Sequence, residues 1–91
     1  MNEKYIINYI KKCISFVTGK NEEQFKEDKL LREYEIDFFD WQEIVIKISD
    51  KYDIIPEKIE KADSIDEIAN IVLNNENKIY EENDIEKIIR I

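Results

Sequence analysis

The sequence contains no histidine, and glycine, proline and cysteine each occur only once. Without histidine and with one cysteine, the chain lacks the usual ligands of a zinc site and the parts of a cysteine–histidine nucleophile. A single glycine is too little for a phosphate-binding loop, which brings backbone without Cβ close to phosphate. The lone Cys13 cannot form a disulfide within the chain, which is typical of a reducing compartment. We therefore expect a protein that is not an enzyme and that holds no cofactor and no metal.

Chain length and net charge bear on the number of domains, the location and the class of partner. The 91 residues suffice for one small domain, and no apolar run approaches the length of a membrane span. The N-terminus lacks an apolar core followed by a small-residue cleavage site, which predicts no signal peptide and a cytoplasmic location. The net charge of −8 argues against nucleic-acid binding and favours basic protein partners.

Isoleucine dominates the apolar residues, with 19 copies against three leucines and three valines. Its β-propensity points weakly to strands, but its spacing in the sequence is helical. Residues 4–18 carry one apolar stripe and end just before Gly19, a natural left-handed residue after a helix. Residues 20–36 are mostly polar, which predicts a long loop with one helical turn.

Residues 38–52 show the clearest helical pattern. Either Asp37 or Asp40 can cap the N-terminus of this helix, and Asp40 with Glu43 resembles a capping box. The apolar residues recur at i, i+3, i+4, i+7 and i+11. They are Trp41, Ile44, Val45, Ile48 and Tyr52.

Three shorter helices are predicted after the helix over 38–52, which is called the acidic helix from here on. A proline suits the first turn of a helix over 56–61, which requires residues 53–55 before it to be extended. The sequence Ser-Ile-Asp-Glu at 64–67 is a capping box for a helix over 65–73, and the asparagines that follow end that helix. A last short helix is predicted over 84–90, with a terminal strand as the alternative. The expected fold class is all-α.

This order of elements resembles the acyl carrier protein family, whose fold is a four-helix bundle with a long first loop. The segment TGKNEEQF at 18–25 is similar to the family's segment after its first helix. The segment KYDIIPE at 51–57 resembles the junction of the second and third helices, and DSIDEI at 63–68 resembles the start of the fourth. The resemblance implies an acyl-carrier-like bundle over 1–74. Residues 75–91 have no counterpart in the family pattern, and we expect them to form a C-terminal extension, a short helix that packs on the bundle.

The family's Asp-Ser-Leu motif begins its second helix, and its serine carries a phosphopantetheine arm. The corresponding residues here are Asp37, Phe38, Phe39 and Asp40. Both acids and the apolar third position match, but Phe38 takes the place of the serine. Because a phenyl ring has no hydroxyl to form a phosphodiester, the resemblance implies a carrier-like protein whose phosphopantetheine site is lost.

A second serine offers an alternative attachment site. Asp63, Ser64, Ile65 and Asp66 also read as Asp-Ser-aliphatic-acid, so the chain could be a working carrier modified at Ser64. Three helices would then have to follow within 27 residues, and the acidic helix would precede the serine. We favour Ser64 as a helix N-cap bonded to the amide of Glu67, because serine is a preferred residue there.

The start of the acidic helix carries the predicted partner-binding residues. In carrier proteins the acidic surface of the second helix docks basic patches on enzymes, and such complementarity mainly raises the association rate. Exposed aromatic side chains are frequent interface anchors, and consecutive residues of a helix cannot all face inward. We expect Phe39 inside, and Phe38 or Trp41 partly outside. The predicted docking residues are Glu33, Glu35, Asp37, Phe38, Asp40, Trp41 and Glu43.

These patterns predict a non-catalytic, acyl-carrier-like protein-interaction module without a prosthetic arm. It would dock a basic partner, such as a carrier-binding biosynthetic enzyme, through the acidic and aromatic start of its second helix. A small acidic inhibitor, or immunity protein, that neutralises a basic toxin is the alternative. One tight complex would favour the inhibitor, and weak binding to several biosynthetic enzymes would favour the carrier-like module.

Overall fold

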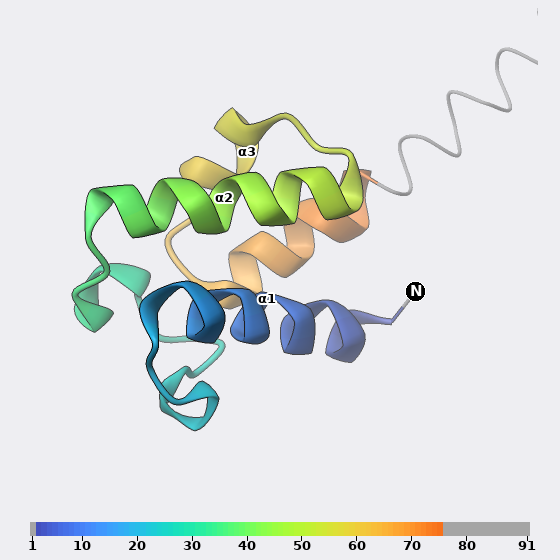
Figure 1. Cartoon of the computed structure of the whole chain (residues 1–91). Coiled ribbons are helices and arrows are strands. Elements are labelled where there is room, and N and C mark those ends of the chain that lie inside the picture. Colours follow the sequence, from blue (N-terminus) through green and yellow to red (C-terminus); the bar gives the residue numbers. More distant parts are fainter. Residues whose placement is uncertain (1, 76–91) are drawn as a thin grey trace, which may run out of the picture.

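Every α-helical element predicted within residues 2–75, the part that this computed structural model describes, is present (Figure 1). The two long helices are α1 (Glu3–Thr18) and α2 (Phe38–Tyr52), and the short α3 (Pro56–Glu60) follows α2. A further helix covers residues 65–75. The all-α class is confirmed, since these described residues form no strand beyond one isolated β-bridge.

The last described helix is longer than predicted. Asn74 and Asn75 were expected to end it, but both are helical. Asparagine disfavours a helix by less than about 1 kcal/mol relative to alanine, so this preference is easily overridden. No helix within residues 2–75 is long and apolar enough to cross a bilayer. The helix predicted over 84–90, and its packing on the bundle, lie outside the described residues.

Both ends of α1 are capped, and the cap at its C-terminus is the predicted one. The Asn2 side chain accepts a hydrogen bond from the Tyr5 N–H (2.9 Å). Gly19 adopts the left-handed conformation with φ of 74°, and its N–H donates to the Ser15 carbonyl. A residue with a Cβ would be strained at this φ, so the only glycine is placed where the helix must stop.

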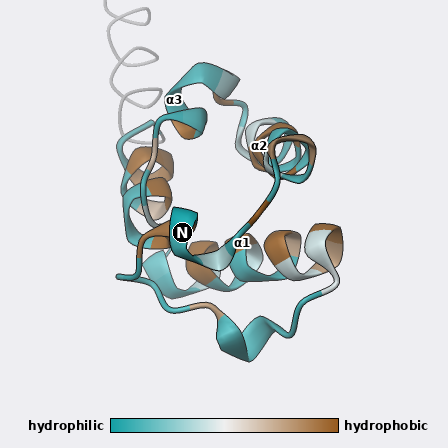
Figure 2. Ribbon diagram, turned by 90° about the vertical axis from the view of Figure 1, so that its left-hand side faces the viewer, coloured by the Kyte–Doolittle hydropathy of each residue, from teal (hydrophilic) through white to brown (hydrophobic). Residues whose placement is uncertain are grey.

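The isoleucine stripes meet in one core. α1 and α2 run antiparallel (Figure 1), and the hydropathy of each helix changes around its axis (Figure 2). Burial of their facing side chains is the main favourable term in the stability of so small a domain. The fully buried isoleucines are Ile6, Ile10, Ile14, Ile44, Ile48, Ile59, Ile65 and Ile68.

The long loop between α1 and α2 holds two 3-10 helices, η1 (Glu22–Gln24) and η2 (Leu31–Tyr34), where one helical turn was predicted. Phe25 lies between them, fully buried, with its ring edge-on to Tyr34 at a centroid distance of 5.0 Å. Two backbone hydrogen bonds tie the loop to the start of helix 65–75: Leu31 N–H to the Asp63 carbonyl (2.7 Å) and Asp66 N–H to the Glu27 carbonyl (3.0 Å). The loop therefore has a defined position beside that helix.

The turn after α2 differs from the prediction at one residue. Asp53 was expected to be extended, but it is left-handed, with φ of 54° and ψ of 53°. Its N–H and that of Ile54 both donate to the Ser49 carbonyl, as in the usual closure of a helix C-terminus. Ile55 is extended as the following Pro56 requires.

One buried hydroxyl in α2 gives a first prediction. Ser49 is 4% exposed, and its hydroxyl has no hydrogen-bond partner among the described residues. Because an unsatisfied buried hydroxyl costs about 1–3 kcal/mol, Ser49→Ala is expected to raise the free energy of unfolding by about 1 kcal/mol. Urea unfolding followed by far-UV circular dichroism measures the change.

Ser15→Ala is the matched control. The Ser15 hydroxyl donates to the Lys20 carbonyl at 2.6 Å, so its removal is expected to lower stability. A Ser49→Ala protein less stable than the wild type would contradict the assignment of Ser49 as an uncompensated buried group.

Candidate functional site

The start of α2 is capped by Asp37. Its carboxylate accepts a hydrogen bond from the Asp40 N–H at 2.8 Å, and its extended backbone precedes the first helical turn. Of the two predicted caps, the structure selects Asp37. The predicted capping box of Asp40 and Glu43 is wrong, because Asp40 is the third residue inside the helix.

Two neighbouring phenylalanines are exposed at this helix start. Phe38 is 66% exposed and Phe39 is 81% exposed. Their rings meet edge-on, with centroids 5.8 Å apart. The outward position of Phe38 agrees with the prediction, but the inward position of Phe39 was wrong. Phe39 precedes Trp41 by two residues, about 200° around the helix, and so faces away from the core.

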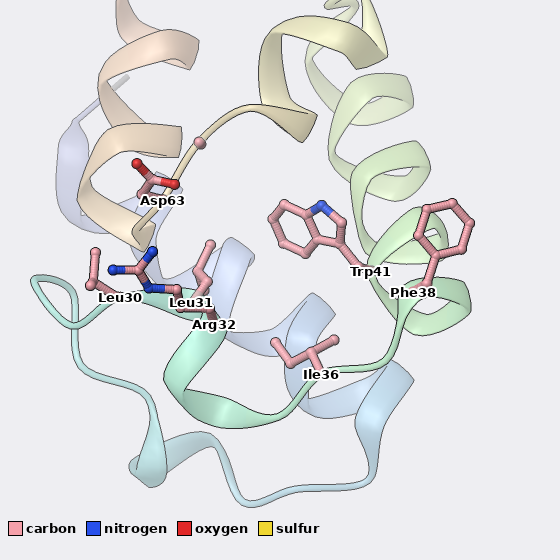
Figure 3. Close-up of a pocket in the computed structure, with 8 residues that line it drawn as sticks. Leu30, Leu31, Arg32, Ile36, Phe38, Trp41 and Asp63 are labelled. Atoms are coloured by element: carbon pink, nitrogen blue, oxygen red, sulfur yellow. The ribbon is translucent and has the colours of Figure 1, made fainter.

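Trp41 is half-buried and lines an open pocket of about 370 Å³. Figure 3 shows its indole ring pointing from α2 toward the segment that contains Asp63, with Ile36 below it. Apolar side chains form most of the lining, and Arg32 and Asp63 supply the charged groups. The lining residues are Leu30, Leu31, Arg32, Ile36, Phe38, Trp41, Ala62 and Asp63.

The predicted acids surround the same helix start. Four of them are exposed and Asp40 is partly so: Glu33, Glu35, Asp37, Asp40 and Glu43. Glu35 is left-handed, with φ of 56°, and turns the chain from η2 toward Asp37. Within residues 2–75 the only salt bridge joins Lys11 and Glu27 at 2.9 Å, which lowers the pKa of the Glu27 carboxyl. The acids near α2 are thus not neutralised by ion pairs in the described chain.

Ser64 follows the pocket-lining residue Asp63 and caps helix 65–75. Its hydroxyl accepts a hydrogen bond from the Glu67 N–H at 3.1 Å, as predicted. The Glu67 carboxylate accepts from the Asp63 N–H at 2.8 Å, one residue earlier than a standard capping box requires. The Ser64 hydroxyl is therefore engaged in holding the start of helix 65–75.

The thiol of Cys13 is buried in the bundle, and Tyr9 is partly buried beside it. Cys13 is 7% exposed, and burial raises the pKa of its thiol. Burial raises the pKa of Tyr9 to about 12, and a hydrogen bond with Cys13 is the next largest cause. Both groups thus stay protonated near neutral pH and offer no nucleophile. Within residues 2–75, no group of three or more acidic or cysteine side chains could hold a metal ion.

Most of the pocket was not predicted from the sequence. Phe38 and Trp41 were predicted as site residues, but the contributions of η2, Ile36 and the Ala62–Asp63 segment were not. These residues come from loops far apart in the sequence, where no periodic pattern marks a shared site. The β-bridge between Leu30 and Ser64 brings the segments together and is visible only in the folded chain.

Comparisons with family models, with curated proteins and with solved structures found no match to this chain.

Proposed function

We propose that the chain is an acyl-carrier-like protein-interaction module that has lost the prosthetic arm and docks a basic partner at the start of α2. The docking surface consists of Glu33, Glu35, Asp37, Phe38, Asp40, Trp41 and Glu43, with Phe39 added because of its exposure. The order of helices around one core and the position of Phe38 as the first residue of α2 support the resemblance on which the proposal rests.

The exposure of Phe38 and Phe39 is the observation that carries the proposal. A large apolar side chain that stays exposed contributes little burial free energy to the folded chain. Contiguous exposed apolar patches mark interaction sites. Two such rings in contact at one helix start form a ready anchor for a partner. The same position in a carrier protein bears the arm, so the surface that once presented the arm now presents a ring.

The acids around these rings supply the steering. None of them forms a salt bridge in the described chain, so their charges face solvent and attract a basic surface. Complementary charge raises the association rate at low ionic strength, and this increase in rate becomes smaller as salt is added. The rings then provide affinity, because their apolar area is removed from water in the complex.

Phe38→Ala is expected to abolish capture of the partner from a cell extract by the immobilised full chain. The captured proteins are identified by mass spectrometry, and the proposal expects them to be basic and to elute with salt. Phe16→Ala is the matched control, because Phe16 is 77% exposed on α1, outside the proposed surface. Equal losses with both variants would contradict a docking site at α2.

The number of captured proteins separates the two candidate roles. Several biosynthetic enzymes held weakly would favour the carrier-like module. A single basic protein held through high salt would favour an acidic inhibitor that uses the same surface.

A further inference from the structure

An open, mostly apolar pocket lies beside Trp41 at the proposed docking surface. Its volume of about 370 Å³ lies at the lower end of the range of ligand-binding pockets. The Trp41 indole points from α2 toward the side formed by Leu30 and Leu31, with Ile36 below it (Figure 3). Phe38 also contributes to the lining, but its ring points away from Trp41 (Figure 3). A side chain that entered here would be removed from water on several sides.

Exposed acids adjoin the residues that line this pocket. Glu33 follows Arg32 in the sequence, and Glu35 and Asp37 stand on either side of Ile36. These three acids and Asp63 of the lining are called the rim. Arg32 is the only cationic lining residue, and the carboxylate of Asp63 offsets its charge. An apolar cavity within a negative rim is complementary to an apolar side chain with cationic neighbours.

We propose that the pocket receives a large apolar side chain from a lysine- or arginine-rich segment of the partner protein. The inference rests on the proposed function and adds to it the chemistry of the docking segment. The cationic residues of that segment meet the acids of the rim, and its apolar residue packs against Trp41 and Ile36. Such a central apolar anchor with a polar rim is the usual arrangement of an interaction hot spot.

A second copy of this chain is a poorer occupant. Two copies that met at this surface would bring the same acids against one another, and like charges placed in contact disfavour association. Phe38 and Phe39 are exposed between Asp37 and Asp40 in the sequence. Insertion of either ring into the pocket of another copy would therefore bring the acids of the two copies together. Concentration-independent sedimentation of the isolated chain as a monomer agrees with a foreign partner, and dimerisation blocked by Ile36→Ser would overturn the proposal.

Two synthetic peptides test the anchor directly. One carries a leucine flanked by lysines, and the other carries alanine in its place. Trp41 is the only tryptophan, so its emission reports on the pocket during titration of the full chain. We expect the leucine peptide to bind roughly tenfold more tightly than the alanine peptide, and to shift the Trp41 emission.

Matched isoleucine variants locate the effect. Ile36→Ser, inside the pocket, is expected to remove the advantage of the leucine peptide, whereas Ile55→Ser, at an exposed site before α3, is expected to retain it. Far-UV circular dichroism of each variant checks the fold. Equal binding of both peptides to the wild type, or an advantage that survives Ile36→Ser, would overturn the anchor.

The outcomes distinguish this inference from the proposed function. If both peptides bind equally and salt weakens both, the acidic docking surface stands and the pocket anchor fails. If neither peptide binds at low salt, the attraction of the acidic surface for basic segments fails as well.

Discussion

Ile48→Ala is expected to lower the free energy of unfolding by about 2–5 kcal/mol, the range for removal of a large aliphatic side chain from a packed core. Ile48 is fully buried in α2 and belongs to the core cluster that includes Ile10 and Ile14 of α1. A domain of this size has a total stability of roughly 5–14 kcal/mol, so the loss is a large part of it. Urea unfolding followed by far-UV circular dichroism measures the change.

Ile46→Ala is the control for this variant, because it removes the same atoms from the same helix. Ile46 is 52% exposed, and its replacement is expected to change stability by less than about 0.5 kcal/mol. Similar effects of the two substitutions would contradict the placement of the core face of α2. A large loss confined to Ile48→Ala would support the burial pattern on which the exposure of Phe39 also depends.

The two long helices could be predicted because their sequences repeat at the helical period. α2 has the predicted bounds, and α1 begins only one residue before its predicted start. Gly19 marks the end of α1 because the required left-handed φ of 74° excludes most other residues without strain. The helical period of the apolar residues and the conformation of Gly19 therefore made these boundaries predictable.

The orientation of Phe39 could not be predicted by the same means. Phe39 was predicted to face inward, and Phe38 or Trp41 outward, because consecutive residues of a helix cannot all face the same way. The core face of α2 is already occupied by the residues that follow Trp41, and Phe39 lies about 200° away from that tryptophan around the helix. The angular position of Phe39 around the helix therefore determines its exposure, although its side chain is hydrophobic.

The pocket also required the folded chain. Leu31 donates a backbone hydrogen bond to the Asp63 carbonyl, and this contact spans more than thirty residues of sequence. Loop residues of this kind have no periodicity that would link them. The sequence thus predicted the helix that carries Phe38 and Trp41, but not the opposite wall that makes a cavity beside them.

Phe38→Ser is expected to convert the chain from an unmodified protein into a substrate of a phosphopantetheinyl transferase. The substitution restores the Asp-Ser-apolar-acid motif at the start of α2, between the cap residue Asp37 and Asp40. Phe38 is 66% exposed, so a serine hydroxyl at its position would face solvent and be open to an enzyme. Serine is also well tolerated at a helix N-terminus, which leaves the fold unchanged.

Intact-mass spectrometry after incubation with the transferase and coenzyme A is the most direct test of a carrier-like chain that has lost its arm. The four proteins to compare are the wild type, Phe38→Ser, Ser64→Ala and the double variant. We expect no mass gain for the wild type or Ser64→Ala, and the mass of one arm for both proteins with serine at position 38. A wild-type gain that Ser64→Ala removes, or no gain in Phe38→Ser, would contradict a lost attachment site at Phe38.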